Sequence, residues 1–132
     1  MITSRKITLG KLTTHGIIIE PHENTSIAVL LADGNDVELL KKSRTPNTKS
    51  ADIFMCKLNW EIKAPTGKTI RAIDRIIHRA VHQSQNIIID TRRTPIKDSV
   101  LITTLEKYFR KMPSIRNLWI IDKSQQIIKF KK

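Results

Sequence analysis

Two acidic residues and a lysine lie close together in a segment that is otherwise largely apolar. Asp52 opens the sequence DIFMC, and Glu61 and Lys63 follow in WEIKA. Side chains of a strand point alternately to its two faces, so Glu61 and Lys63 share one face while Trp60 and Ile62 share the other. Two short strands joined by a tight turn would form an antiparallel hairpin. Such a hairpin brings Asp52 near Glu61.

Two carboxylates held close together repel each other, and a divalent cation relieves that repulsion. Oxygen ligands suit Mg²⁺, which binds through one or two carboxylates together with phosphate oxygens. Asp52 and Glu61 are therefore candidate metal ligands, and the ion would acidify a water molecule for attack on a phosphate. Lys63 would orient that water or neutralise the phosphate in the transition state. The alternative is structural: Asp52 caps a turn, and Glu61 and Lys63 form a solvated pair.

The remaining pattern predicts an α/β fold, with a mixed central β-sheet flanked by helices. A helical crossover between residues 59–64 and the apolar run NIIID implies a parallel pair of strands. Two further short strands are expected around Gly10 and Gly16. The predicted helices are 22–33, 69–84 and 97–111, and the other predicted strands are 36–40, 52–56, 59–64, 86–90, 117–122 and 126–130.

Several local expectations accompany these elements. Residues 57–59 should form the hairpin turn, and Cys56 should pack in the core as part of an apolar run. Apolar stripes are expected to include Ile70 on the second helix and Val100 on the third. Thr69 is a candidate N-cap for the second helix.

Charge is the strongest signal in the composition. The 132 residues carry 24 Lys and Arg against 12 Asp and Glu, a net charge of +12. This surplus favours a polyanionic partner, most simply nucleic acid. The length suggests one domain, residues 1–132, with an N-terminal extension at 1–20 and a core at 21–132. No apolar run approaches the roughly 20 residues that cross a bilayer, and no secretory signal is evident.

Basic side chains gather around the second helix and behind the central strand. Arg71, Arg75 and Arg79 recur every four residues and line one helix face, which is either a backbone-binding surface or a solvated one. Arg92 and Arg93 follow the central strand, where α/β folds often bind ligands. The full set of candidate nucleic-acid contacts is Lys68, Arg71, Arg75, Arg79, Arg92 and Arg93.

The hairpin motif resembles that of the PD-(D/E)XK nucleases. The residues that carry the likeness are AD at 51–52, with Ala51 in place of the usual proline, and EIK at 61–63. The longer segment WEIKAPTGKTIRAIDRIIHRAVHQSQNIIIDTRR resembles the tRNase toxin domain at the C-terminus of CdiA-type contact-dependent growth inhibition proteins. The likeness covers roughly residues 20–132 and is strongest at 52–93.

The resemblance implies a metal-dependent endonuclease that cleaves RNA, most plausibly tRNA. It would act in the bacterial cytoplasm after delivery from another cell, and an acidic immunity protein would be its partner. The residues it implicates in catalysis are Glu23, Asp52, Glu61, Lys63 and Thr66, with Mg²⁺ as the expected metal. A DNA nuclease of the same fold and a non-catalytic nucleic-acid-binding module are the alternatives.

Overall fold

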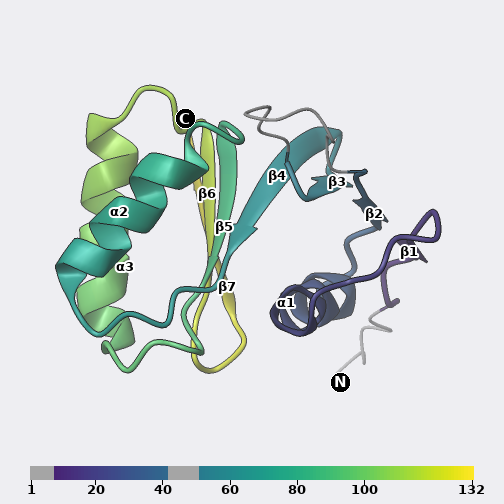
Figure 1. Ribbon diagram of the computed structural model, residues 1–132, viewed down its shortest axis with the longest axis horizontal. Coiled ribbons are helices and arrows are strands. Elements are labelled where there is room, and N and C mark those ends of the chain that lie inside the picture. Colours follow the sequence, from purple (N-terminus) through teal and green to yellow (C-terminus); the bar gives the residue numbers. More distant parts are fainter. Residues whose placement is uncertain (1–7, 42–50) are drawn as a thin grey trace, which may run out of the picture.

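The computed structural model describes residues 8–41 and 51–132. In this part of the chain, three helices flank a seven-stranded sheet in the order β1-β2-β3-β4-β5-β6-β7 (Figure 1). The mixed α/β fold expected from the sequence is thereby confirmed. The elements are β1 Leu12–Thr13, α1 Pro21–Ala32, β2 Val37–Leu39, β3 Ile53–Met55, β4 Leu58–Lys63, α2 Ile70–Ala80, β5 Asn86–Asp90, α3 Asp98–Lys111, β6 Asn117–Ile121 and β7 Ile127–Lys131.

The strand directions follow the connections between the elements. β3 and β4 pair antiparallel through their short turn, and β4 and β5 pair parallel on either side of α2, as the sequence predicts. β5 and β6 are also parallel, on either side of α3, and β7 returns antiparallel to β6. The outer strand β1 lies parallel to β2, which is antiparallel to β3. The three parallel strands β4, β5 and β6 are thus flanked by antiparallel pairs, and one further parallel pair, β1 and β2, lies at the edge of the sheet.

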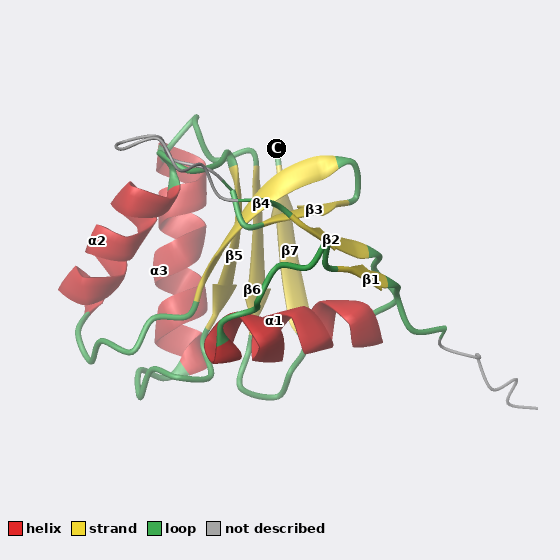
Figure 2. Cartoon of the chain, turned by 45° about the vertical axis from the view of Figure 1, so that its right-hand side comes forward, coloured by secondary structure: helices red, strands yellow, loops and turns green. Residues whose placement is uncertain are grey.

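Two apolar cores lie on opposite faces of the sheet (Figures 1 and 2). α1 packs on one face, where its Ile27 and Leu30 meet Trp60 of β4. α2 and α3 cover the other face through Ile77 and Leu105. The central strand β5 is buried on both faces, which explains why its sequence is a continuous apolar run. None of the helices in the described residues is long and apolar enough to cross a membrane.

Several local expectations prove wrong. The hairpin turn lies at Cys56 and Lys57, whose φ angles of 53° and 63° suit a tight two-residue turn. Cys56 is therefore exposed and does not pack in the core. Ile70 and Val100 are also exposed, at 38% and 45%, because each lies in the first turn of its helix, beyond the buried stripe.

Two element boundaries also differ from expectation. Near Gly10 and Gly16, the described residues contain one short strand, Leu12–Thr13, rather than two. Helix α2 ends at Ala80, so residues 81–84 form a turn instead of a final helical turn. The start of α2 is as predicted, because the Thr69 side chain accepts a hydrogen bond from the backbone N–H of Ala72.

A buried polar cluster joins α1 to the end of β5. Asp90 is 2% exposed, and its carboxylate accepts hydrogen bonds from Ser26 Oγ at 2.7 Å and from Arg92 Nη2 at 2.7 Å. Arg92 Nη2 also donates to the backbone carbonyl of Thr25 in α1. Burial alone would raise the pKa of Asp90, but the hydrogen bonds from Arg92 and Ser26 outweigh it and hold that pKa below its usual value. Arg92 thus has a structural role, because it links the end of β5 to α1.

Replacing Arg92 should therefore destabilise the protein. Arg92→Ala leaves the Asp90 charge buried without its guanidinium, so we expect the free energy of unfolding to fall by about 3 kcal/mol. Urea unfolding followed by tryptophan fluorescence measures the change. The matched control is Arg93→Ala, because Arg93 is exposed. Equal stability of the two variants would contradict a structural role for Arg92.

Candidate active site

The register of the β3–β4 hairpin sets the position of Asp52. Ile53 pairs with Trp60, so the preceding Asp52 lies opposite Glu61. The backbone N–H of Asp52 donates to the carbonyl of Trp60 at 2.9 Å, and its Oδ2 accepts from the N–H of Ile62 at 2.9 Å. Backbone hydrogen bonds on both sides thus fix this carboxylate, which is 5% exposed. The proximity of the two acids expected from the sequence is observed.

Glu61 and Lys63 lie on the same face of β4, as strand alternation requires. Lys63 Nζ is 3.1 Å from Glu61 Oε2. The Glu61 side chain is 1% exposed and that of Lys63 is 27% exposed, so the ammonium group reaches solvent while the carboxyl group does not. Trp60 and Ile62 point to the opposite face and belong to the core beneath α1. The apolar side of the strand therefore anchors its polar side.

The environment of Glu61 disfavours its charge. Burial, together with the hydrogen bond and the charge of neighbouring Asp52, raises the pKa of Glu61 from its ordinary value of 4.5 to about 8. Lys63 acts in the opposite direction but does not compensate. An added positive charge beside the two carboxyl groups would favour the ionised form. Such a perturbed carboxyl group is typical of a functional site.

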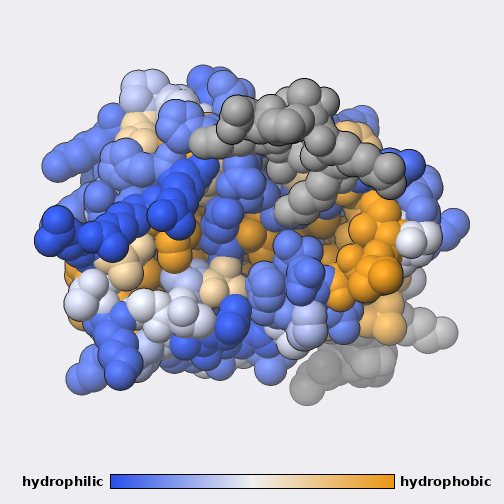
Figure 3. Space-filling view, in the orientation of Figure 1, coloured by the Kyte–Doolittle hydropathy of each residue, from blue (hydrophilic) through white to orange (hydrophobic). Residues whose placement is uncertain are grey.

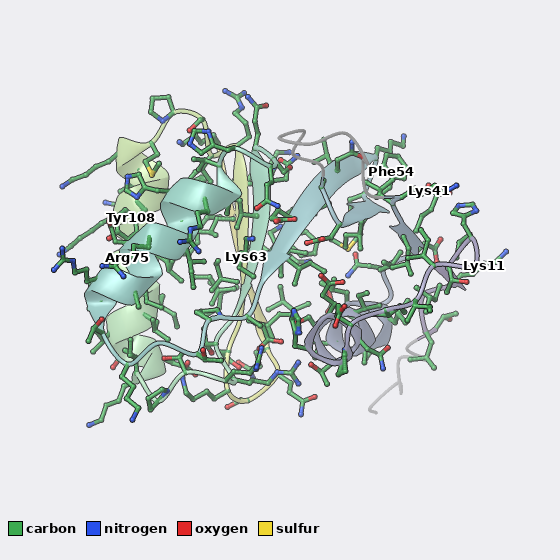
Figure 4. The ribbon with its side chains drawn as sticks, in the orientation of Figure 1. Lys11, Lys41, Phe54, Lys63, Arg75 and Tyr108 are labelled. Atoms are coloured by element: carbon green, nitrogen blue, oxygen red, sulfur yellow. The ribbon has the colours of Figure 1, made fainter. Side chains whose placement is uncertain are left out.

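The three residues border a cleft of about 230 Å³ between α1 and the end of α2. Figure 4 shows Lys63 near the end of β4, between these helices. Glu23, in the first turn of α1, lines the same cleft, as the sequence-based assignment requires. His22 and Gln83 also line it, and sequence reasoning missed both. The pattern that extends the second helix to residue 84 gives Gln83 no site role, whereas the structure ends α2 at Ala80 and places Gln83 on the cleft.

The other predicted site residues lie outside the lining of this cleft. Thr66 is exposed on the loop that follows β4. Gly67 is needed for a close approach to α2, since an added Cβ would lie 2.4 Å from Ala72 Cβ. Its φ angle is not positive, and its carbonyl accepts a hydrogen bond from Thr94 Oγ1. The basic residues that are exposed on or beside α2, or after β5, are Lys68, Arg71, Arg75, Arg79 and Arg93.

The donor set of the cleft fits a hard divalent cation bound by two carboxylates. Glu61 Oε1 is buried and has no hydrogen-bond partner in residues 8–41 and 51–132. The adjacent Asp52 supplies a second carboxylate, and Mg²⁺ needs only one or two such ligands when phosphate and water complete its shell. Within those same residues, no group of three or more His, Cys, Asp or Glu side chains forms a complete metal cage.

Comparison with known proteins identifies the class. Residues 49–127 match the contact-dependent growth inhibition CdiA C-terminal domain family, and the chain belongs to this family. It is a toxin domain of contact-dependent growth inhibition, which confirms this part of the resemblance seen in the sequence. The nuclease type and the tRNA substrate stay predictions.

A solved structure shares the fold. The chain is similar to a chain of a CdiA-CT/CdiI toxin and immunity complex from Burkholderia pseudomallei, with a TM-score of 0.73 and 21% sequence identity. The match covers 93% of this chain and 100% of that chain. No curated protein matches in sequence. At this identity the similarity shows the fold alone, so residue roles must come from the site itself.

The raised pKa of Glu61 predicts a pH-dependent stability without divalent cations. The unfolded carboxyl ionises near 4.5, whereas the folded one keeps its proton up to about 8. This contribution to the free energy of unfolding is therefore complete below 4.5 and is lost as the pH rises to about 8. One proton limits the slope to about 1.4 kcal/mol per pH unit.

Glu61→Gln should remove this component, because the amide does not ionise. The measurement is urea unfolding in EDTA across the same pH range, comparing wild type, Glu61→Gln and the control Glu106→Gln. Glu106 pairs with Arg110 on α3, away from the cleft. If the Glu61→Gln profile keeps the full wild-type slope, Glu61 is not the group that titrates.

Proposed function

We propose that this toxin domain is a metal-dependent endonuclease of the PD-(D/E)XK type that cleaves RNA, with tRNA as its main substrate. The observation that carries the proposal is the convergence of Asp52, Glu61 and Lys63 at one cleft, with Glu61 buried and next to Asp52. The likeness to tRNase toxin domains, strongest at residues 52–93, and the net charge of +12 support a nucleic-acid substrate.

Asp52 and Glu61 would hold the divalent cation, most suitably Mg²⁺. A cation bound there supplies positive charge to the phosphate and acidifies the attacking water. Asp52 is positioned by its hydrogen bond from the Ile62 N–H, and Glu61 by the strand and by Lys63. The two carboxylates are thus oriented before substrate arrives, which avoids reorganisation during the reaction.

Lys63 supplies a partly exposed positive charge at the mouth of the cleft. Its ammonium group contacts Glu61 Oε2 and is partly exposed. From this position it would orient the attacking water or stabilise the charge that accumulates on the phosphate. Glu23, on the α1 side of the cleft, would complete or tune the carboxylate set. Thr66, exposed after β4, would hydrogen-bond the phosphate backbone nearby.

The exposed arginines of α2 would hold the RNA backbone. Figure 3 shows hydrophilic side chains gathered over the α2 side of the face on which the cleft opens. Arg71, Arg75 and Arg79 are all exposed there, while Gln83, just beyond the helix, lines the cleft. RNA bound along α2 would therefore lead into the catalytic residues. Arg92 is paired with Asp90, and its phosphate contact stays a prediction.

An acidic immunity protein would be the natural partner of such a domain. The similar chain comes from a toxin and immunity complex, and a net charge of +12 favours an acidic surface. By covering the cleft and α2 together, it would block both the catalytic carboxylates and the RNA-binding arginines.

A cleavage assay tests the proposed activity. Wild type should fragment tRNA with Mg²⁺ and not with EDTA, and Glu61→Ala or Lys63→Ala should lower the rate by at least about 100-fold. Glu106→Ala is the matched control on α3 and should keep full activity. Single-stranded and duplex DNA are assayed in parallel.

Each other outcome overturns a defined part of the proposal. Cleavage that persists in EDTA would remove the metal role of Asp52 and Glu61. Preference for DNA would contradict the substrate assignment. Binding of RNA without cleavage would indicate a non-catalytic module.

The salt dependence of binding tests the role of α2. If Arg75 contacts one phosphate, Arg75→Ala should make the plot of log binding constant against log salt concentration less steep by about 0.7, the value per contact for single-stranded nucleic acid. Filter binding of tRNA to Glu61→Gln protein measures the slope without cleavage. Arg110→Ala is the control, because Arg110 lies on α3 and forms an ion pair with Glu106, with 2.6 Å between Nη2 and Oε1. Identical slopes for Arg75→Ala and its parent would exclude this contact.

A further inference from the structure

A second groove adjoins the catalytic cleft at the end of α2. It has a volume of about 560 Å³ and shares one lining residue, Gln83, with the cleft that contains Asp52 and Glu61. The turn after α2 lines it with Ser84 and Gln85, and Asn59 of β4 lies directly beside Ser84. The two depressions are therefore neighbours on the surface.

The groove wall is fixed by a network of short polar side chains. Ser84 Oγ and Asn86 Nδ2 both donate to the backbone carbonyl of Asn59, at 2.7 and 3.0 Å. Asn117 Nδ2 donates to Asn86 Oδ1 at 2.8 Å. The backbone carbonyl of Gln85 accepts from the N–H of Arg116 at 2.7 Å. The main chain of the wall is thus rigid, although much of it is a turn.

The groove presents amide side chains that this network does not use. In the described part of the chain, the side chains of Asn59, Gln83 and Gln85 make no hydrogen bond. Asn59 and Gln85 are exposed and Gln83 is half-buried. Each amide offers both a donor and an acceptor. Three such groups around one groove suit a ligand whose edge alternates donors and acceptors.

The charge of the groove differs from that of the catalytic cleft. Among its described lining residues there is no carboxylate, and Lys41 is the one cationic side chain. A metal ion therefore has no charged ligand there, whereas a neutral base attached to a phosphate meets amides and a lysine. Nucleobase edges are recognised by Asn and Gln amides through paired hydrogen bonds.

We propose that this groove binds the base of a nucleotide next to the scissile phosphate, and that Asn59, Gln83 and Gln85 select that base. The inference rests on the proposed nuclease function, because the catalytic cleft locates the phosphate. If the scissile phosphate lies at Asp52 and Glu61, the RNA chain that continues past Gln83 enters the amide-lined groove. The groove thereby turns a general phosphodiester site into one with a base preference.

The test separates base selection from catalysis. Short oligoribonucleotides that differ only in the base next to the cleaved bond are cut by wild type, Gln85→Ala and Asn59→Ala. The base preference is the ratio of kcat/KM for the best base to kcat/KM for the worst base. We expect each variant to lower this ratio roughly tenfold. Gln126→Ala, an exposed glutamine on the β6–β7 hairpin, is the matched control.

A binding measurement keeps the inference independent of turnover. Glu61→Gln protein is titrated with fluorescent oligoribonucleotides of each base, with and without Gln85→Ala, and unfolding curves verify that all variants are folded. A base preference that disappears in the Gln85→Ala variant supports base selection by the groove. Unchanged preference, or none in the parent, overturns it even if tRNA is cleaved. Absence of cleavage by wild type overturns the proposed function, and the binding preference then decides the groove separately.

Discussion

The placement of two carboxyl groups side by side in the β3–β4 hairpin is the constraint on which the site depends. Ionising a buried carboxyl group costs several kcal/mol unless it is paired, and Asp52 adds repulsion to the desolvation of Glu61. The opposite face of the same strands offsets this cost. Ile53 and Ile62 are buried beneath α1, and each contributes about 1.5–3 kcal/mol. The ring of Trp60 packs against that of Trp119, with 4.8 Å between the ring centroids, and this contact further fixes β4.

The distribution of charge follows from this arrangement. The acids of the site lie inside the cleft, while the arginines of α2 remain on the surface. A basic exterior attracts a polyanion over a range that salt limits, whereas the buried pair acts only at contact. In the proposed function, the surface would govern capture of the substrate, and the interior would govern what happens to one phosphate. The two effects are separable because different residues carry them.

Much of this geometry follows from periodicity in the sequence. A period of two residues places Glu61 and Lys63 on one face, and a short turn between two strands places Asp52 opposite Glu61. What the sequence did not reveal depends on where elements end. α2 stops at Ala80, and the turn that follows places Gln83 in the cleft. Helix ends are weakly encoded here, since the apolar stripe continues to Val81.

Arg92, a basic residue that follows a parallel strand, has a structural role that its position in the sequence does not show. The position rule for α/β sheets favoured a phosphate contact. The structure pairs Arg92 with Asp90, a buried carboxylate that requires a positive partner, and the phosphate contact stays a prediction. Asp90 also accepts from Ser26, so the pair joins β5 to α1, the helix that carries Glu23. The Asp90–Arg92 pair thereby holds α1, which places Glu23 on one wall of the cleft, against the end of β5.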